Sequence, residues 1–136
     1  MREKIIILAR SCVGTKFRHQ GRIPGRGLDC VGLIRYPAVT VGLYGEEADE
    51  FGYSSEPNPD AMENALLRWL DRISVKDILP ADILWLKSPQ PQHLAVYTGE
   101  TIIHSDARRG KVIEHGYRDP FPRLVVGAWR YRGIDG

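Results

Sequence analysis

The chain of 136 residues is poor in cysteine, and it has no strong excess of charge. Cys12 and Cys30 are its two cysteines, and neither belongs to a Cys-x-x-Cys pair. This excludes a disulfide scaffold, and without a Cys-x-x-Cys or His-x-x-x-His spacing a metal site is not expected. With 19 basic and 17 acidic residues and no basic tract, nucleic acid and lipid surfaces are not expected as main partners.

Long apolar runs are also missing. The run IIILA, residues 5–9, is too short for a secretory signal or a membrane span, so we expect neither signal peptide nor membrane insertion. The sequence contains no repeat, no low-complexity segment and no long linker, so residues 1–136 are expected to form one domain.

The first half of the chain has helical patterns divided by loops. Apolar spacing predicts a helix over residues 2–13, and the glycine-rich stretch 18–28 predicts a basic loop. Asp29 is a good N-cap for a helix that starts at Cys30, in which Pro37 should cause a kink or a second start. After the acidic excursion 44–60, Asp60 could cap a helix from Ala61 to about Arg72.

From Pro80 onward the pattern changes from helical to extended. Short runs rich in β-branched and aromatic residues predict about five antiparallel strands: ADILWLK, HLAVYTG, TIIHS, KVIEHG and LVVGAWRYR. This order predicts an α+β domain, with N-terminal helices packed on one side of a meander of strands.

Cys30 is the first candidate functional residue. At the start of a helix, unpaired N–H groups and the macrodipole favour a thiolate, so this position is expected to lower the thiol pKa. The alternative is that Cys30 is simply a small buried apolar residue.

Two histidines favour the interpretation of Cys30 as a reactive thiol over that of a buried apolar residue. If His93 and His104 lie on paired strands, one imidazole can meet the thiol and the other can orient the first. Each histidine alone is more often a half-buried core residue, but together with a helix-start cysteine the pattern favours nucleophilic catalysis.

These residues resemble the NlpC-type cell-wall cysteine peptidases, which are papain-like. The resemblance rests on GTKFRHQGRIPGRGLDCVGLI, on PADILWLK and on HLAVYTGETIIHS, and covers roughly residues 5 to 105. It implies Cys30 as the nucleophile, His93 as the general base and His104 as the residue that fixes the His93 ring. The implied reaction is hydrolysis of an amide in peptidoglycan stem peptides, of the D-glutamyl-diamino acid type.

The sequence departs from the family in the loop before the nucleophile. Phe17 stands where the family has a tyrosine, and His19 and Gln20 replace a glycine pair. These three residues, together with Arg22 and Arg26, are candidates for substrate binding, the arginines through stem-peptide carboxylates. Solvated loop charges remain the alternative for the arginines.

The loop variant resembles the branch of the family that is encoded with phage tails and gene-transfer particles. This implies a protein made in the bacterial cytoplasm without a signal peptide, which acts on the cell wall as part of a phage-like particle with tail proteins as partners. A non-catalytic tail-assembly module and an acyltransferase with the same triad are the alternatives. Whether residues 44–60 cover the cleft stays open, and His115 is expected to be a loop or edge residue.

Overall fold

The computed structural model describes residues 1–50, 52–56, 58–87 and 93–136. The polar stretch 88–92, expected to lead into the strand of His93, lies outside the described residues. The helices are α1 (Arg2–Ser11), α2 (Cys30–Thr40) and α3 (Pro59–Trp69). Within the described ranges, no helix is both long and apolar enough to cross a membrane.

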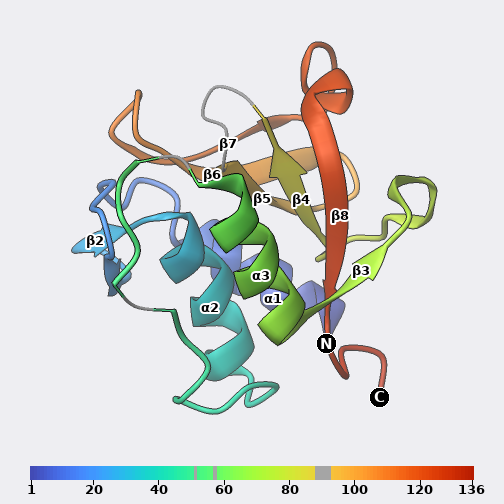
Figure 1. The fold of residues 1–136 in the computed structure, drawn as a ribbon, viewed down its shortest axis with the longest axis horizontal. Coiled ribbons are helices and arrows are strands. Elements are labelled where there is room, and N and C mark those ends of the chain that lie inside the picture. The colour runs from blue at the N-terminus through green and yellow to red at the C-terminus, as the bar shows by residue number, and fades with distance from the viewer. Residues whose placement is uncertain (51, 57, 88–92) are drawn as a thin grey trace.

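The strands form a large antiparallel sheet and a small ribbon. The large sheet has six strands in the order β3-β8-β4-β5-β6-β7 (Figure 1). Its strands are β3 (Leu70–Ile73), β4 (Ile83–Leu86), β5 (His93–Tyr97), β6 (Thr101–Asp106), β7 (Lys111–Gly116) and β8 (Val125–Tyr131). The ribbon joins β1 (Arg22–Ile23) and β2 (Gly27–Leu28) inside the loop that was expected to hold no regular element.

The predicted meander is confirmed for β4 to β7, but the last strand departs from it. Instead of extending the meander beside β7, β8 returns to the other side of the sheet and pairs with both β4 and β3. β3 differs from the expectation of a helix to about Arg72, because its residues continue the apolar pattern of the preceding helix. The helix ends at Trp69, and its cap is Asn58, whose side chain accepts from Ala61 N, rather than Asp60.

The main core lies between the helices and one face of the sheet (Figure 1). Because side chains alternate along a strand, Ile83 and Trp85 face this core, whereas Leu84 and Leu86 face a smaller apolar cluster on the other side. The prediction of helices packed on an antiparallel sheet is therefore confirmed. Helix α2 continues through Pro37 to Thr40, so no second helix begins there.

The chain ends meet beside the sheet. The Arg2 guanidinium bonds to Asp135 at 2.9 Å and to the buried Asp82 carboxylate at 3.1 Å. Arg130 on β8 binds the same Asp82 at 2.8 Å. One buried carboxylate thus ties α1, the turn before β4 and β8 into one unit.

Candidate active site

Cys30 is the first residue of α2, as predicted. The preceding Asp29 is the N-cap, and its Oδ1 accepts from Gly32 N at 2.9 Å. The Cys30 sulfur makes backbone hydrogen bonds with Val31 and with Leu94 of β5. The thiol at the helix start therefore contacts β5 next to His93, the first residue of that strand.

The expectation of a lowered thiol pKa is wrong for this structure. Burial, followed by the negative charge of Asp29, raises the pKa of Cys30 to about 12, and the backbone hydrogen bonds and Arg22 offset this only in part. The cap explains the difference: a carboxylate that satisfies the helix-start amides also places its own charge beside the sulfur. These effects favour the neutral form of the Cys30 thiol.

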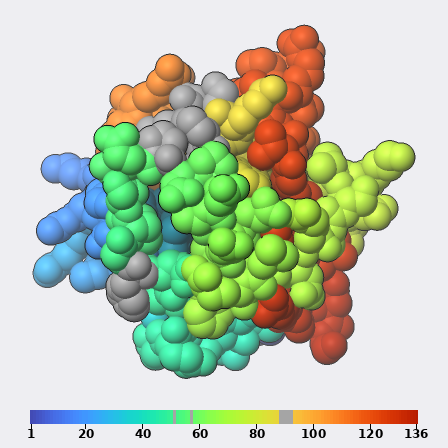
Figure 2. Space-filling model, in the orientation of Figure 1, coloured from blue at the N-terminus to red at the C-terminus, as the bar shows by residue number. Residues whose placement is uncertain are grey.

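Asp29 is the centre of a polar cluster that joins the loop to the acidic excursion. Its Oδ2 accepts from Gln20 N at 2.8 Å and from the Tyr53 hydroxyl. Arg22 donates to Asp29 at 2.9 Å, to Asp49 at 2.9 Å and to the Tyr53 hydroxyl at 2.8 Å. The described part of the excursion is thus anchored beside Cys30, and Figure 2 shows it passing between the blue loop region and the green α3.

A close backbone contact fixes the loop against α2. A Cβ added at Gly32 would lie 2.1 Å from the carbonyl oxygen of Gly21, and one added at Gly21 would lie 2.5 Å from that of Gly27. Neither position can hold a side chain without moving backbone. The glycine two residues after Cys30 is therefore explained by packing of the loop that borders the site.

His93 and His104 meet as predicted. His93 Nε2 lies 2.5 Å from His104 Nδ1, and the two side chains are 2% and 1% exposed. His93 begins β5, and His104 lies inside β6. The pairing between these two strands is limited to Val96 with Ile103 and Tyr97 with Ile102, so neither histidine takes part in it. His93 pairs instead with Leu86 of β4, and His104 pairs with Ile113 of β7, so the outer neighbours hold the two backbones while the imidazoles meet.

A third histidine continues this row. His104 Nε2 lies 2.8 Å from His115 Nε2 on β7, and His115 Nδ1 lies 3.0 Å from the carbonyl oxygen of Gly116. The Phe121 ring packs on His115, with centroids 4.4 Å apart. His115 was expected to be a loop or edge residue, and it does lie on the edge strand β7. The pairing of β7 with β6 also places its ring against His104, a contact that was not predicted.

Burial keeps the first two imidazoles neutral. Desolvation is the main cause that lowers the pKa of His93 to about 4, and the Asp106 carboxylate opposes it. Desolvation and the neighbouring His93 and His115 lower the pKa of His104 to about 3. At neutral pH these shifts favour a neutral thiol at Cys30 and neutral imidazoles at His93 and His104.

The predicted substrate-binding residues do not all line the same surface. His19, Gln20 and Arg26 line one surface hollow with Arg18, and both His19 Nε2 and Gln20 Nε2 also contact Tyr53 O. Arg22, by contrast, is committed to internal partners. Phe17 is half-buried, and its backbone bridges Leu28 and Gly110.

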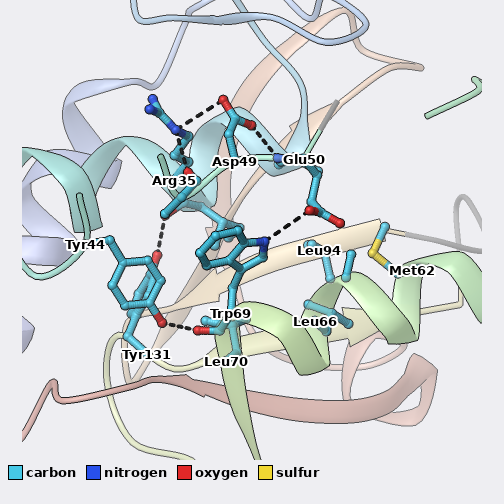
Figure 3. Close-up of a pocket in the computed structure, with 14 residues that line it drawn as sticks. Arg35, Tyr44, Asp49, Glu50, Met62, Leu66, Trp69, Leu70, Leu94 and Tyr131 are labelled. Carbon is cyan, nitrogen blue, oxygen red and sulfur yellow. Dashed lines mark hydrogen bonds and ion pairs between the residues drawn. The ribbon is translucent and has the colours of Figure 1, made fainter. Parts of the chain in front are cut away.

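An apolar cavity of about 70 Å³ lies behind α2 (Figure 3). It is bounded by α2, α3, the excursion and the sheet, and Trp69, Leu66 and Met62 point into it. Val31 and Leu94, whose backbones bond to the Cys30 sulfur, also line it. The cavity therefore lies next to two residues that contact Cys30. Among the described residues, no group of histidine, cysteine and carboxylate side chains is arranged to hold a metal ion.

The fold matches solved structures of NlpC/p60 domains. The NlpC/p60 domain of the peptidoglycan hydrolase SagA is 22% identical, with a TM-score of 0.67, over 95% of this chain and 97% of that one. NlpC2 from Trichomonas vaginalis is 23% identical, with a TM-score of 0.67, over 96% of this chain and 46% of that one. The chain therefore has the NlpC/p60 fold, an α+β papain-like arrangement. It spans less than half of NlpC2.

A third similar structure has no catalytic activity. RipD from Mycobacterium tuberculosis, described as a non-catalytic NlpC/p60 domain protein adapted to peptidoglycan binding, is 16% identical, with a TM-score of 0.61, over 96% of both chains. No family model and no curated sequence matches this chain. The fold alone thus leaves catalysis to be argued from the residues of the site.

Sequence reasoning missed two contributors. Tyr53 supplies a hydroxyl beside Asp29 from a segment with no regular pattern, and no sequence signal indicated it. His115 did leave a signal. With a tight turn after Asp106, the β6–β7 hairpin pairs Ile102 with His115 and His104 with Ile113, so the two histidines are diagonal neighbours on one face.

Proposed function

We propose that this protein is a cysteine peptidase that hydrolyses an amide bond in peptidoglycan stem peptides, of the D-glutamyl-diamino acid type. One observation carries the proposal: the Cys30 sulfur, at a helix start, bonds to the backbone of the residue that follows His93, and His93 is itself paired with His104. The NlpC/p60 fold, shared with the domain of a peptidoglycan hydrolase, supports the substrate class.

The proposed reaction begins with proton transfer. His93 takes the proton of the Cys30 thiol as the sulfur attacks the scissile carbonyl carbon, and the carbonyl oxygen becomes an oxyanion. The helix-start amide of Cys30 stabilises that oxyanion. The imidazolium of His93 then protonates the leaving amine, and a thioester remains. Water, deprotonated by His93, hydrolyses the thioester and restores the thiol.

The surface hollow of the loop is proposed to bind the peptide, because Gln20, which lines it, bonds to Asp29, the residue before Cys30. Arg18 and Arg26 supply positive charge there, while His19 and Gln20 supply polar atoms at its edge. Guanidinium groups suit the carboxylates of a stem peptide. We do not assign this role to Arg22, because Asp29, Asp49 and Tyr53 already hold its guanidinium.

We also propose that the protein acts on the wall as part of a phage-like particle, with tail proteins as partners. The support is the loop variant with Phe17, His19 and Gln20, which resembles the tail-associated branch. Mass spectrometry of purified particles tests this: the protein should co-purify with tail components at a fixed ratio. Recovery of all of it free of particles contradicts the proposal.

Digestion of labelled peptidoglycan tests the chemistry. The protein should release fragments with a new stem-peptide carboxylate, and Cys30→Ala should release none. Cys12→Ala is the matched control, because Cys12 is the other cysteine and is fully buried in the main core. If both the native protein and Cys30→Ala bind peptidoglycan without cutting it, the domain is a binding module such as RipD. Products that carry an added amine acceptor indicate acyl transfer instead.

A further inference from the structure

The row of three histidines ends at the backbone carbonyl of Gly116, and this end fixes which ring nitrogens donate and which accept hydrogen bonds. A carbonyl oxygen can only accept a hydrogen bond. Since His115 Nδ1 lies 3.0 Å from Gly116 O, that nitrogen carries the proton. In a neutral imidazole with a protonated Nδ1, the Nε2 holds a lone pair and can only accept.

The donor and acceptor nitrogens of His104 and His93 then follow, one ring at a time. His115 Nε2 accepts, so His104 Nε2, at 2.8 Å, must donate. His104 Nδ1 then holds a lone pair, and His93 Nε2, at 2.5 Å from it, must donate. With its proton on Nε2, neutral His93 has a lone pair on Nδ1. That nitrogen is then the ring atom of His93 that can take a proton from a thiol.

We propose that His115 is a positioning residue, which through His104 holds His93 in the tautomer with a free Nδ1. This rests on the proposed function, because the tautomer of His93 matters to the reaction only if His93 is the base. His115 acts through another residue and need not touch the substrate.

The surroundings of the three histidines favour this one arrangement of donors and acceptors. His93 and His104 are almost fully buried, so water does not compete for their ring nitrogens. The Phe121 ring covers His115 at 4.4 Å and His104 at 6.4 Å between centroids. On the strand side, β7 is paired with β6 from Thr101 to Asp106, which keeps the His115 backbone in register with His104. The Gly116 carbonyl is thus the fixed reference for the proton positions in all three rings.

Two substitutions of His115 separate its hydrogen bond from its bulk. His115→Phe keeps a ring that can pack on Phe121 but removes the acceptor. His115→Gln loses the ring but offers an amide oxygen that can accept from His104 Nε2. A role in positioning predicts that His115→Gln retains more activity than His115→Phe, whereas a role in packing alone predicts the opposite order.

The direct test is nitrogen NMR of the imidazoles, with histidine labelled by ¹⁵N, because protonated and unprotonated ring nitrogens differ in shift and coupling. We expect the folded protein to show His93 and His104 protonated at Nε2 only, and His115 at Nδ1 only. In His115→Phe a second population with the proton on Nδ1 of His93 should appear. In parallel, kcat should fall between about tenfold and hundredfold with little change in KM, and His115→Gln should recover most of it.

The outcomes distinguish this inference from the proposed function. If the spectra show the stated tautomers and their loss in folded His115→Phe, but no peptidoglycan is cut by the native protein, the inference about His115 holds and the hydrolase proposal fails. Unchanged His93 tautomers and unchanged kcat in His115→Phe overturn the inference. Thermal unfolding of each variant shows whether it has folded. If His115→Phe does not fold, the activity of His115→Gln decides between the two roles: retained activity supports positioning, and lost activity contradicts it.

Discussion

At the scale of single residues, the site combines a helix-start thiol with an acidic cap. Asp29 satisfies the amide of Gly32 and holds Arg22, Gln20 and Tyr53 in place, yet its charge also raises the pKa of Cys30. The thiol and the imidazole of His93 are both neutral across the range between their pKa values of about 4 and about 12. Cys30 is therefore predicted to react slowly with alkylating reagents at pH 7, unlike a resting thiolate.

Substitution of Asp29 tests the electrostatic part of this account. Asp29→Asn removes the negative charge beside the sulfur, so the pKa of Cys30 should fall and its alkylation rate at pH 8 should rise several-fold. The rate should be measured over a pH series with mass spectrometry to separate Cys30 from Cys12. Asp49→Asn is the matched control, because Asp49 also binds Arg22 but is not among the main causes of the pKa shift of Cys30. Equal rate changes in both variants contradict the account.

At the scale of elements, the site depends on a loop packed against a helix at backbone distance. The loop 18–28 contributes to the hollow, and its Gly21 carbonyl lies where a side chain on residue 32 would be. The excursion is tied to the same loop through Arg22, Tyr53 and Asp49. Helix α2, the loop 18–28 and the described part of the excursion are therefore packed and hydrogen-bonded to one another next to β5.

Gly32→Ala should disturb this packing. The added methyl group meets backbone at 2.1 Å, so the loop must shift, and we expect a loss of about 1–3 kcal/mol in the free energy of unfolding. Activity measured on the folded fraction should also fall, since the loop carries Gln20 and Arg26. Thr40→Ala, at an exposed position of the same helix, is the control for helix propensity. Urea unfolding of both variants measures the difference, and equal midpoints contradict the prediction.

The cap of α3 gives a second test at this scale. The Asn58 side chain accepts from Ala61 N at 3.1 Å, so Asn58→Ala should lower the free energy of unfolding by about 1 kcal/mol. Asp60, the cap expected from the sequence, lies inside the first turn of the helix. Asp60→Ala should cost less, about 0.3–1 kcal/mol, through the helix dipole. A larger loss in Asp60→Ala than in Asn58→Ala in urea unfolding contradicts the assigned cap.

At the scale of the whole molecule, buried neutral histidines make stability depend on pH. In the folded protein the pKa of His93 is lowered from 6.5 to about 4, and that of His104 from 6.5 to about 3. Between these values and 6.5 the unfolded chain binds protons that the folded protein does not. Stability therefore falls as the pH decreases through this range, and the loss ends once the folded histidines are protonated.

We predict that the free energy of unfolding decreases between pH 7 and pH 5 by about 2 kcal/mol for each histidine that stays neutral. The carboxyl groups with lowered pKa, such as those of Glu50 and Glu114, have ordinary values of 4.5 and titrate below this window. The double variant His93→Gln, His104→Gln should show a flatter pH dependence in urea unfolding. A slope equal to that of the native protein shows that other groups control the effect.

The sequence by itself determined the α+β class, α1 and α2, the five later strands, and the position of Cys30 behind its cap. These features follow from local patterns: apolar period, turn residues and capping chemistry act within a few positions of the chain. The meeting of His93 with His104 was also predictable, because the two strands follow each other through a tight turn. The family resemblance added the roles of these residues.

Only the tertiary structure decided the rest, since those features join segments that are distant in the sequence. The return of β8 to β4, the Tyr53 hydroxyl beside Asp29 and the burial of the site have no local pattern. The pKa of Cys30 was predicted in the wrong direction for the same reason. A helix start favours the thiolate locally, but desolvation by the surrounding core and the charge of Asp29 outweigh it, and burial is a property of the whole fold.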